Sequence, residues 1–434
     1  MGVGILTLPW AMSNIGLLPS LILMLLSFLL SYICWILLCL LCEKYRVYAY
    51  RDVGFILFGD RFARSLDLIL LVFLYFVCIL YVVFLSEFVI DGLTEFDISI
   101  NTHIGFSNLH TLTSFGEFVQ TKFFIITVTV FAILFPLCLL RRLDSLKYSS
   151  FLGIIGCFYT IGLVVFIFFD ATDKRGYYLS PNVQFFGNFH SANGEHSYIW
   201  YWLSSFSVFV ASFNTHFNCP ALYGELKEKT PRKYITISSL SFVMVLIVNL
   251  LLGVCGYFTF GTSLDENILD TLNHGLVVGI ARFIMTLTII GTYPLLFWNI
   301  KVSIKNLVLY KNVSNEQHTK IKKIKRKYTC GCSKISIYFL VTLVIWIVAI
   351  VAFDVAVMIS FLQSLLGNAI VFIFPAVFYL QMLKNEAKKS VPSKTNMTKV
   401  FCATVLCYIL VIFGTVSVIG GCIASIMFWV GYIQ

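Results

Sequence analysis

The sequence predicts an all-α integral membrane protein, a bundle of long helices built from two related halves. Hydrophobic residues make up 59% of the 434 positions, charged residues only 12%, and the mean hydropathy is +0.90. Soluble domains carry about 25% charged residues. Apolar stretches long enough to cross about 30 Å of hydrocarbon recur along the whole chain. Two of the predicted helices are also interrupted, at corresponding positions, by residues that weaken helices.

Ten stretches have the length and composition of membrane-spanning helices, and the opening segment makes a partial eleventh. Each stretch is too long and too uniformly apolar to be an alternating strand of a membrane barrel, so a helical bundle is favoured. In chain order the stretches are 20–42, 66–90, 123–140, 149–169, 198–222, 235–258, 277–299, 337–358, 360–382 and 400–430.

The loops between these helices set the topology. The net charge of +10 does not indicate nucleic-acid binding, because 27 of the 31 basic residues fall on one face when loops alternate between two faces. The opposite loops hold acidic residues such as Asp91, Glu266 and Asp270. The positive-inside rule therefore predicts cytosolic basic loops and an extracellular or luminal C-terminus.

The opening segment, GVGILTLPW, places Gly2, Gly4 and Pro9 beside lipid-type sequence. Glycine costs a helix interior about 1 kcal/mol relative to alanine, and proline about 3 kcal/mol. The sixth predicted helix has a similar defect in ASFNTHFNCP, where polar residues precede Pro220. Because each half then contains five helices, an odd number, the halves are predicted to be inverted. Such a matched pair indicates the binding site of a transporter.

The two interruptions predict one substrate site. Unwound backbone in a membrane is tolerated where it lines a cavity, and its free N–H and C=O groups can then hold a carboxylate and an amine. The first interruption would hold the carboxylate at the positive end of the following half-helix, with the second opposite it. The alternative is two kinked packing helices. The predicted substrate-binding residues are Gly2, Val3, Gly4, Ile5, Leu6, Ser212, Phe213, Asn214, Thr215 and His216.

Several motifs resemble, in chain order, those of the amino acid/auxin permease family. GVGILTLPWAMSNIG is similar to the family's first-helix signature, and RDVGFILFG to the segment after helix two. PLCLLRRLDSLKYSSFLG resembles the junction of helices four and five, and ASFNTHFNCPALYGELKEKTPRKY resembles helix six with its exit. GYFTFG is similar to the end of helix seven, and SLLGNAIVFIFPAVFYL to helix ten. Within this family, the sequence resembles the sodium-coupled neutral and vacuolar amino acid transporters.

The resemblance implies an eleven-helix LeuT-type fold and secondary transport of amino acids, with neutral ones favoured. The driving ion would be H⁺ or Na⁺, with no other cofactor. Residues 1–434 would form one transporter domain, with inverted repeats at 1–170 and 198–383 and an added helix at 400–434. We expect the amino acid and membrane lipid as partners, and a functional monomer in the plasma membrane or a vacuolar or lysosomal membrane.

Two kinds of residue are candidates for ion coupling. His216 could relay a proton, or it could be a fixed hydrogen-bonding partner. Family members of both coupling kinds carry this histidine, which favours the fixed role. Thr286 and Thr288 of the eighth helix could join a Na⁺ site, although a threonine within a membrane helix usually bonds its own helix backbone.

Gating and charge define a further set of candidates. Tyr75 and Tyr81 are predicted aromatic gates, and Glu225 is either an inner gate that pairs with a basic loop or a solvated helix end. Arg282 and Asp354 are ionisable residues within membrane helices, so they should face the bundle interior or an interface, where they could pair.

The family has a half-helix before the Gly-x-Gly motif, whereas this sequence begins at Met1. We therefore expect the natural protein to be longer at its N-terminus. In sodium-coupled members that half-helix carries a cation-linked asparagine, so H⁺ is favoured over Na⁺ by a small margin.

Two other function classes were weighed against transport. A membrane-embedded acyltransferase would also place a histidine inside a helical bundle, but it predicts no matched interruptions, so no enzymatic activity is expected. An amino-acid-binding membrane sensor without net transport is the alternative function.

Overall fold

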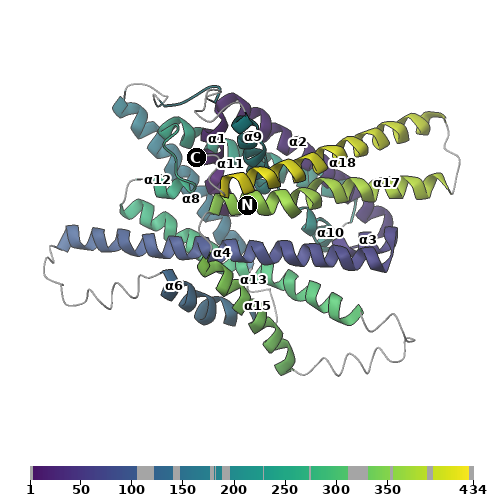
Figure 1. The fold of residues 1–434 in the computed structure, drawn as a ribbon, viewed down its shortest axis with the longest axis horizontal. Coiled ribbons are helices and arrows are strands. Elements are labelled where there is room, and N and C mark those ends of the chain that lie inside the picture. The colour runs from purple at the N-terminus through teal and green to yellow at the C-terminus, as the bar shows by residue number, and fades with distance from the viewer. Residues whose placement is uncertain are drawn as a thin grey trace. The chain divides into compact units, whose positions relative to one another are not determined.

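The computed structural model is helical in the parts of the chain that it describes, and those parts contain no strand (Figure 1). The described residues are 3–104, 122–139, 147–175, 180, 182–187, 196–227, 229–272, 275–310, 331–351, 355–388 and 394–429. The predicted all-α class is therefore confirmed for these residues.

The first half of the chain contains η1 (Val3–Thr7), α1 (Leu8–Ile15), α2 (Leu17–Tyr45), α3 (Tyr50–Phe58), α4 (Asp60–Ile104), α6 (Lys122–Val128), η2 (Thr129–Leu134), α7 (Phe135–Cys138) and α8 (Lys147–Arg175). The second half contains α9 (His196–Ser212), η4 (His216–Asn218), α10 (Cys219–Glu225), α11 (Pro231–Phe260), α12 (Ile268–Thr271), α13 (Leu276–Tyr310), α15 (Gly331–Val351), α16 (Val355–Leu362), η5 (Gln363–Gly367), η6 (Ala369–Ile373), α17 (Phe374–Ala387) and α18 (Lys394–Trp429). Segments η1 and η4 are 3₁₀ helices, whereas η2, η5 and η6 are π-helical.

Seven helices in the described parts are long and apolar enough to cross a membrane. They are Leu17–Tyr45, Asp60–Leu93, Gly153–Ala171, Pro231–Phe260, Leu276–Leu307, Ala356–Ala387 and Thr398–Met427. Two further apolar helices, Phe123–Cys138 and Ile335–Val351, are shorter. All of these coincide with predicted stretches. The count of eleven stays a prediction, because the opening segment and the sixth helix form short pieces.

The described chain divides into two compact units, each assembled from separate segments of sequence. The first unit comprises Met1–Leu66, Val164–Ile268 and Ala356–Gln434, and the second comprises Asp67–Leu163 and Leu269–Val355. Each unit therefore combines helices from both halves of the sequence.

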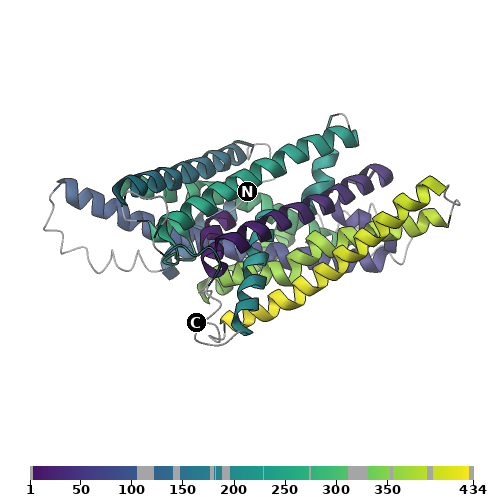
Figure 2. The same ribbon diagram turned by 90° about the horizontal axis from the view of Figure 1, so that it is seen from above.

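In the first unit, α1 packs against α9 and α11 because small residues allow a close approach. A Cβ atom added to Gly256 of α11 would lie 2.9 Å from the ring of Pro9 in α1. Gly16, with φ of +87°, ends α1 and lets the chain turn into α2. The helices α17 and α18 run side by side in both views (Figures 1 and 2) and share an apolar core with α2 and α9.

In the second unit, α13 contacts η2 and α7, and α15 packs against α6. Gly156 of α8 lies close to α13, since a Cβ atom placed there would be 2.9 Å from the hydroxyl oxygen of Thr288. Trp346 of α15 donates from its indole nitrogen to the Thr127 hydroxyl of α6 at 3.0 Å.

Candidate functional site

The first interruption is a 3₁₀ segment, η1, that leads into the short helix α1. Gly2 lies outside the described residues, and so does the side chain of Val3. A Cβ atom on Gly4 would meet no atom within 4 Å, so there is open space beside this backbone. Ile5 and Leu6 are buried, so Gly4 is the residue of this segment beside which the structure shows open space. The predicted weakening of the helix is confirmed.

The second interruption separates α9 from α10, as predicted (Figure 1). Residues Phe213–Thr215 are not helical, and Thr215 is exposed. The chain resumes as η4 and then as α10, whose first turn contains Pro220. Proline suits that position because the N–H group it lacks would have no partner within the helix.

Polar groups of other helices hold the two sides of this break. Asn249 of α11 donates from Nδ2 to the Ser212 hydroxyl at 2.8 Å, and that hydroxyl donates to the carbonyl of Phe209 at 2.7 Å. Asn214 donates from Nδ2 to Oε1 of Gln363, at the start of η5, at 2.9 Å. Both sides of the break are therefore tied by side-chain hydrogen bonds.

Three of the amides in and beside the break were not selected from the sequence: Asn249, Gln363 and Asn368. Gln363 donates from Nε2 to Oδ1 of Asn368 at 3.3 Å, and all three side chains are buried. The available signal was that each is an amide in an otherwise apolar stretch, VLIVNLLLG or ISFLQSLLGNAI. Such residues usually face the interior of a membrane protein and mark its functional sites.

His216 is fully buried, and its Nε2 atom lies 2.8 Å from the carbonyl oxygen of Ser31 in α2. Its ring packs edge-on against Trp35. Phe213 is also buried and stacks on Phe242 of α11, with ring centroids 6.3 Å apart. The structure therefore places Ser212, Asn214 and His216 at one break within the first unit, with aromatic rings packed against His216 and Phe213.

The predicted gating residues lie on separate elements. Tyr75 and Tyr81 are on α4 in the second unit. Glu225 is the last residue of α10 and is exposed, with no ion-pair partner within the described ranges. The gating role of these residues stays a prediction.

Both threonines proposed for sodium binding donate to their own helix. Thr286 donates to the carbonyl of Arg282 at 2.8 Å, and Thr288 donates to the carbonyl of Ile284 at 2.9 Å. A cation would be coordinated by these hydroxyl oxygens through their lone pairs. The described residues contain no cluster of His, Cys, Asp or Glu that could hold a metal ion. The Na⁺ site stays a prediction.

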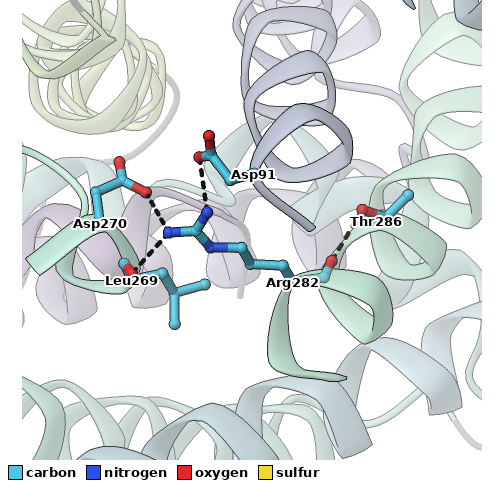
Figure 3. A network of polar contacts seen from close by, with 5 residues as sticks. All are labelled: Asp91, Leu269, Asp270, Arg282 and Thr286. Carbon is cyan, nitrogen blue, oxygen red and sulfur yellow. Dashed lines mark hydrogen bonds and ion pairs between the residues drawn. The ribbon is translucent and has the colours of Figure 1, made fainter. Parts of the chain in front are cut away.

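A buried guanidinium forms the strongest charge cluster in the second unit (Figure 3). Arg282 of α13 reaches Asp91 of α4 at 2.9 Å and Asp270 of α12 at 3.1 Å. It also donates to the carbonyl of Leu269 at 2.9 Å. Asp354, considered as a partner from the sequence, lies outside the described residues. The two acids seen here instead belong to the acidic loops of the predicted outer face.

The family profile described as "Transmembrane amino acid transporter protein" matches residues 1–427. The chain therefore belongs to this family, and the resemblance drawn from its motifs is confirmed. The fold and the family together define a multi-pass membrane protein of the amino acid transporter class.

Among known proteins, the chain is similar to vacuolar amino acid transporter 5 of Saccharomyces cerevisiae, with 25% identity over 316 residues, 71% of this chain and 64% of that protein. It is 23% identical to sodium-coupled neutral amino acid transporter 7 of Homo sapiens over 283 residues, 64% of this chain and 56% of that protein. The matched part thus spans less than two thirds of the length of either relative.

Proposed function

We propose that this protein is a secondary active transporter that moves neutral amino acids across a membrane by alternating access. The observation that carries the proposal is the polar break between α9 and α10, whose Asn214 and Ser212 are held by amides from α11 and η5. A membrane helix broken beside a set of buried polar groups is the form that substrate sites of secondary transporters take.

We propose that the substrate lies between the two interruptions, as in an eleven-helix LeuT-type fold. The backbone N–H groups near Gly4, Ile5 and Leu6 precede α1, and the positive end of a helix favours a carboxylate. The open space beside Gly4 supports this assignment, because a ligand can approach the backbone there. The polar side chains of Ser212, Asn214 and Thr215 are then available for the rest of the substrate.

The composition of the two units supports transport by movement of one body against another. Each unit takes helices from both halves of the sequence, as expected where two inverted repeats interleave. In sequence, we propose that residues 1–170 and 198–383 form the two inverted repeats.

A transmembrane cation gradient is the proposed driving force, carried by H⁺ or Na⁺. The contact of His216 with the Ser31 carbonyl and its aromatic surroundings support a fixed structural role for this ring. The hydroxyl oxygens of Thr286 and Thr288 are the proposed sodium ligands. We place the protein in a plasma membrane or a vacuolar or lysosomal membrane, with its basic loops in the cytosol and its C-terminus outside or in the lumen.

Uptake by the purified full chain in proteoliposomes tests the proposal. Each of the twenty L-amino acids is supplied in radiolabelled form under a pH gradient, a Na⁺ gradient, both or neither. We expect accumulation of neutral amino acids above equilibrium with at least one gradient, and its loss when the gradient is dissipated. Saturable binding without accumulation under any gradient would instead favour the amino acid sensor.

A further inference from the structure

We propose that the side chains of Asn214, Gln363 and Asn368, here called the amide chain, present a fixed hydrogen-bond acceptor to the α-ammonium group of the substrate. The inference rests on the proposed function. It adds Gln363 and Asn368 of the tenth helix to the site. It also specifies that the protein accepts this hydrogen bond and the substrate donates it.

The amide chain is directional. Nδ2 of Asn214 donates to Oε1 of Gln363 at 2.9 Å, and Nε2 of Gln363 donates to Oδ1 of Asn368 at 3.3 Å. One of the two N–H bonds of the Asn214 amide is therefore occupied, and rotation of the amide is restrained. Its Oδ1 atom is buried and has no hydrogen-bond partner in the described part of the protein. Oδ1 is thus the polar atom of Asn214 that is left for a donor from the substrate.

A buried acceptor without a partner is costly, and folded proteins contain few of them. A ligand that donates a hydrogen bond would remove this cost, whereas a carboxylate at the same place would be repelled. Of the two groups that nearly all α-amino acids share, only the ammonium donates. The substrate would then lie with its ammonium at Asn214 and its carboxylate at the N–H groups of the first interruption.

The local structure of the tenth helix holds Gln363 in this arrangement. Gln363 begins the π-helical segment η5, and Gly367 ends it. A Cβ atom on Gly367 would lie 2.6 Å from Nε2 of Gln363, closer than real contacts allow, so the amide rests against bare backbone. Gln363 is 3% exposed and Asn368 is fully buried, and the bond between them uses Nε2 of Gln363 and Oδ1 of Asn368. Gln363 is therefore a positioning residue that acts through Asn214.

A purely structural role for the amide chain would be to fasten α9 to the tenth helix, as polar residues do between membrane helices. The two roles differ in what they control. Fastening affects stability, and it affects the affinity for all ligands alike. Presentation of an acceptor affects the preference for ligands that carry an ammonium group over ligands that do not.

The experiment measures that preference in the full chain reconstituted in proteoliposomes. The probes are L-alanine and L-leucine with their deaminated counterparts, propionate and 4-methylpentanoate. For each compound we measure the concentration that halves amino acid uptake. The readout is this concentration for the deaminated compound divided by the same concentration for the amino acid. In the wild type we expect a ratio of about 100 or more, since hydrogen bonds to charged groups are the strong ones.

Six variants separate the two roles. Asn214→Leu, which lacks the acceptor, should lower the ratio about 10-fold or more. Gln363→Leu, and Gly367→Ala through displacement of Gln363, should lower it about 3- to 10-fold. Gln363→Glu, which keeps an acceptor for Nδ2 of Asn214, should keep the ratio. Asn214→Asp, which keeps the acceptor for the ammonium but loses the bond to Oε1 of Gln363, should lower the ratio no more than Gln363→Leu does. Gln381→Leu on α17 is the matched control, because Nε2 of Gln381 likewise donates to Oδ1 of Asn385, about five helical turns further along the chain.

Wild-type ratios in folded Gln363→Leu and Gly367→Ala would overturn the inference. A greater loss of the preference in folded Asn214→Asp than in folded Gln363→Leu would also overturn it, because Asn214→Asp retains the acceptor oxygen. Thermal unfolding in detergent establishes which variants fold. Because Gln363→Leu and Gly367→Ala perturb the amide of Gln363 in two different ways, the test stays decisive if one of these variants does not fold. A wild type that takes up none of the twenty amino acids would refute the proposed function itself, before any variant is compared.

Discussion

Neutralising the two acids around Arg282 should destabilise the protein more than removing Arg282 itself. Arg282 is 2% exposed, whereas Asp91 and Asp270 are 35% and 36% exposed. The double variant Asp91→Asn with Asp270→Asn removes the charge of both carboxylates that contact a buried guanidinium. The variant Arg282→Met leaves two carboxylates that water already reaches.

The expected magnitudes follow from this difference in exposure. Leaving one charge of a buried pair without its partner costs about 3–5 kcal/mol. Since asparagine oxygens can still accept hydrogen bonds from the guanidinium, we expect about 3 kcal/mol for the double variant. For Arg282→Met we expect about 1–2 kcal/mol, because pairs with partly exposed members are screened by solvent. The triple variant should be close to Arg282→Met, since no buried charge remains.

The measurement is thermal unfolding of purified protein in one detergent, at low salt and at neutral pH. We expect the midpoint to fall by about 3–6 °C in the double variant and by about 1–3 °C in Arg282→Met. Arg232→Met is the matched control, because Arg232 is exposed at the start of α11, and it should leave the midpoint unchanged. The reasoning is wrong if Arg282→Met is the most damaging change, or if the triple variant is as unstable as the double variant.

Four further predictions concern transport and packing. Gly4→Leu should reduce uptake at least about 10-fold while the protein still folds, because the new side chain enters the open space where the substrate is proposed to meet the backbone; uptake at the wild-type rate would remove this segment from the site. Ser212→Leu should raise KM, and unchanged KM would leave the break with a structural role only. Thr288→Val should lower Na⁺-driven uptake about 10-fold if sodium is the driving ion, whereas uptake that survives choline and rises from about pH 7.5 to 5.5 assigns H⁺. Gly256→Val should lower stability by about 1–3 kcal/mol by overpacking against the rigid ring of Pro9, and an unchanged unfolding midpoint would contradict that contact.

Local composition was sufficient to predict the helices and their interruptions. A run of apolar residues longer than the hydrocarbon core forms a helix in a membrane because its backbone groups have no other hydrogen-bonding partners. The break at Phe213–Thr215 was equally predictable from the sequence, because polar residues lie close to Pro220 in the chain. In both cases the cause lies within a few residues of the effect.

Pairing between distant residues could not be predicted in this way. Asn214 and Gln363 are 149 positions apart, and neither residue carries a local mark of the other. Arg282 was recognised as a charge that needs a partner, but the sequence offered several acids. Packing of α13 against α4 and α12 selected Asp91 and Asp270.

The sequence by itself therefore determined the membrane class, the helices, the two interruptions and the family. These features follow from hydrophobicity, backbone propensity and local motifs, which act over short stretches of chain. Tertiary structure alone decided which buried amides hold the second interruption and which acids neutralise Arg282. The physical reason is that a buried polar group must be satisfied by whatever group folding brings within about 3 Å of it, and sequence separation has no part in that choice.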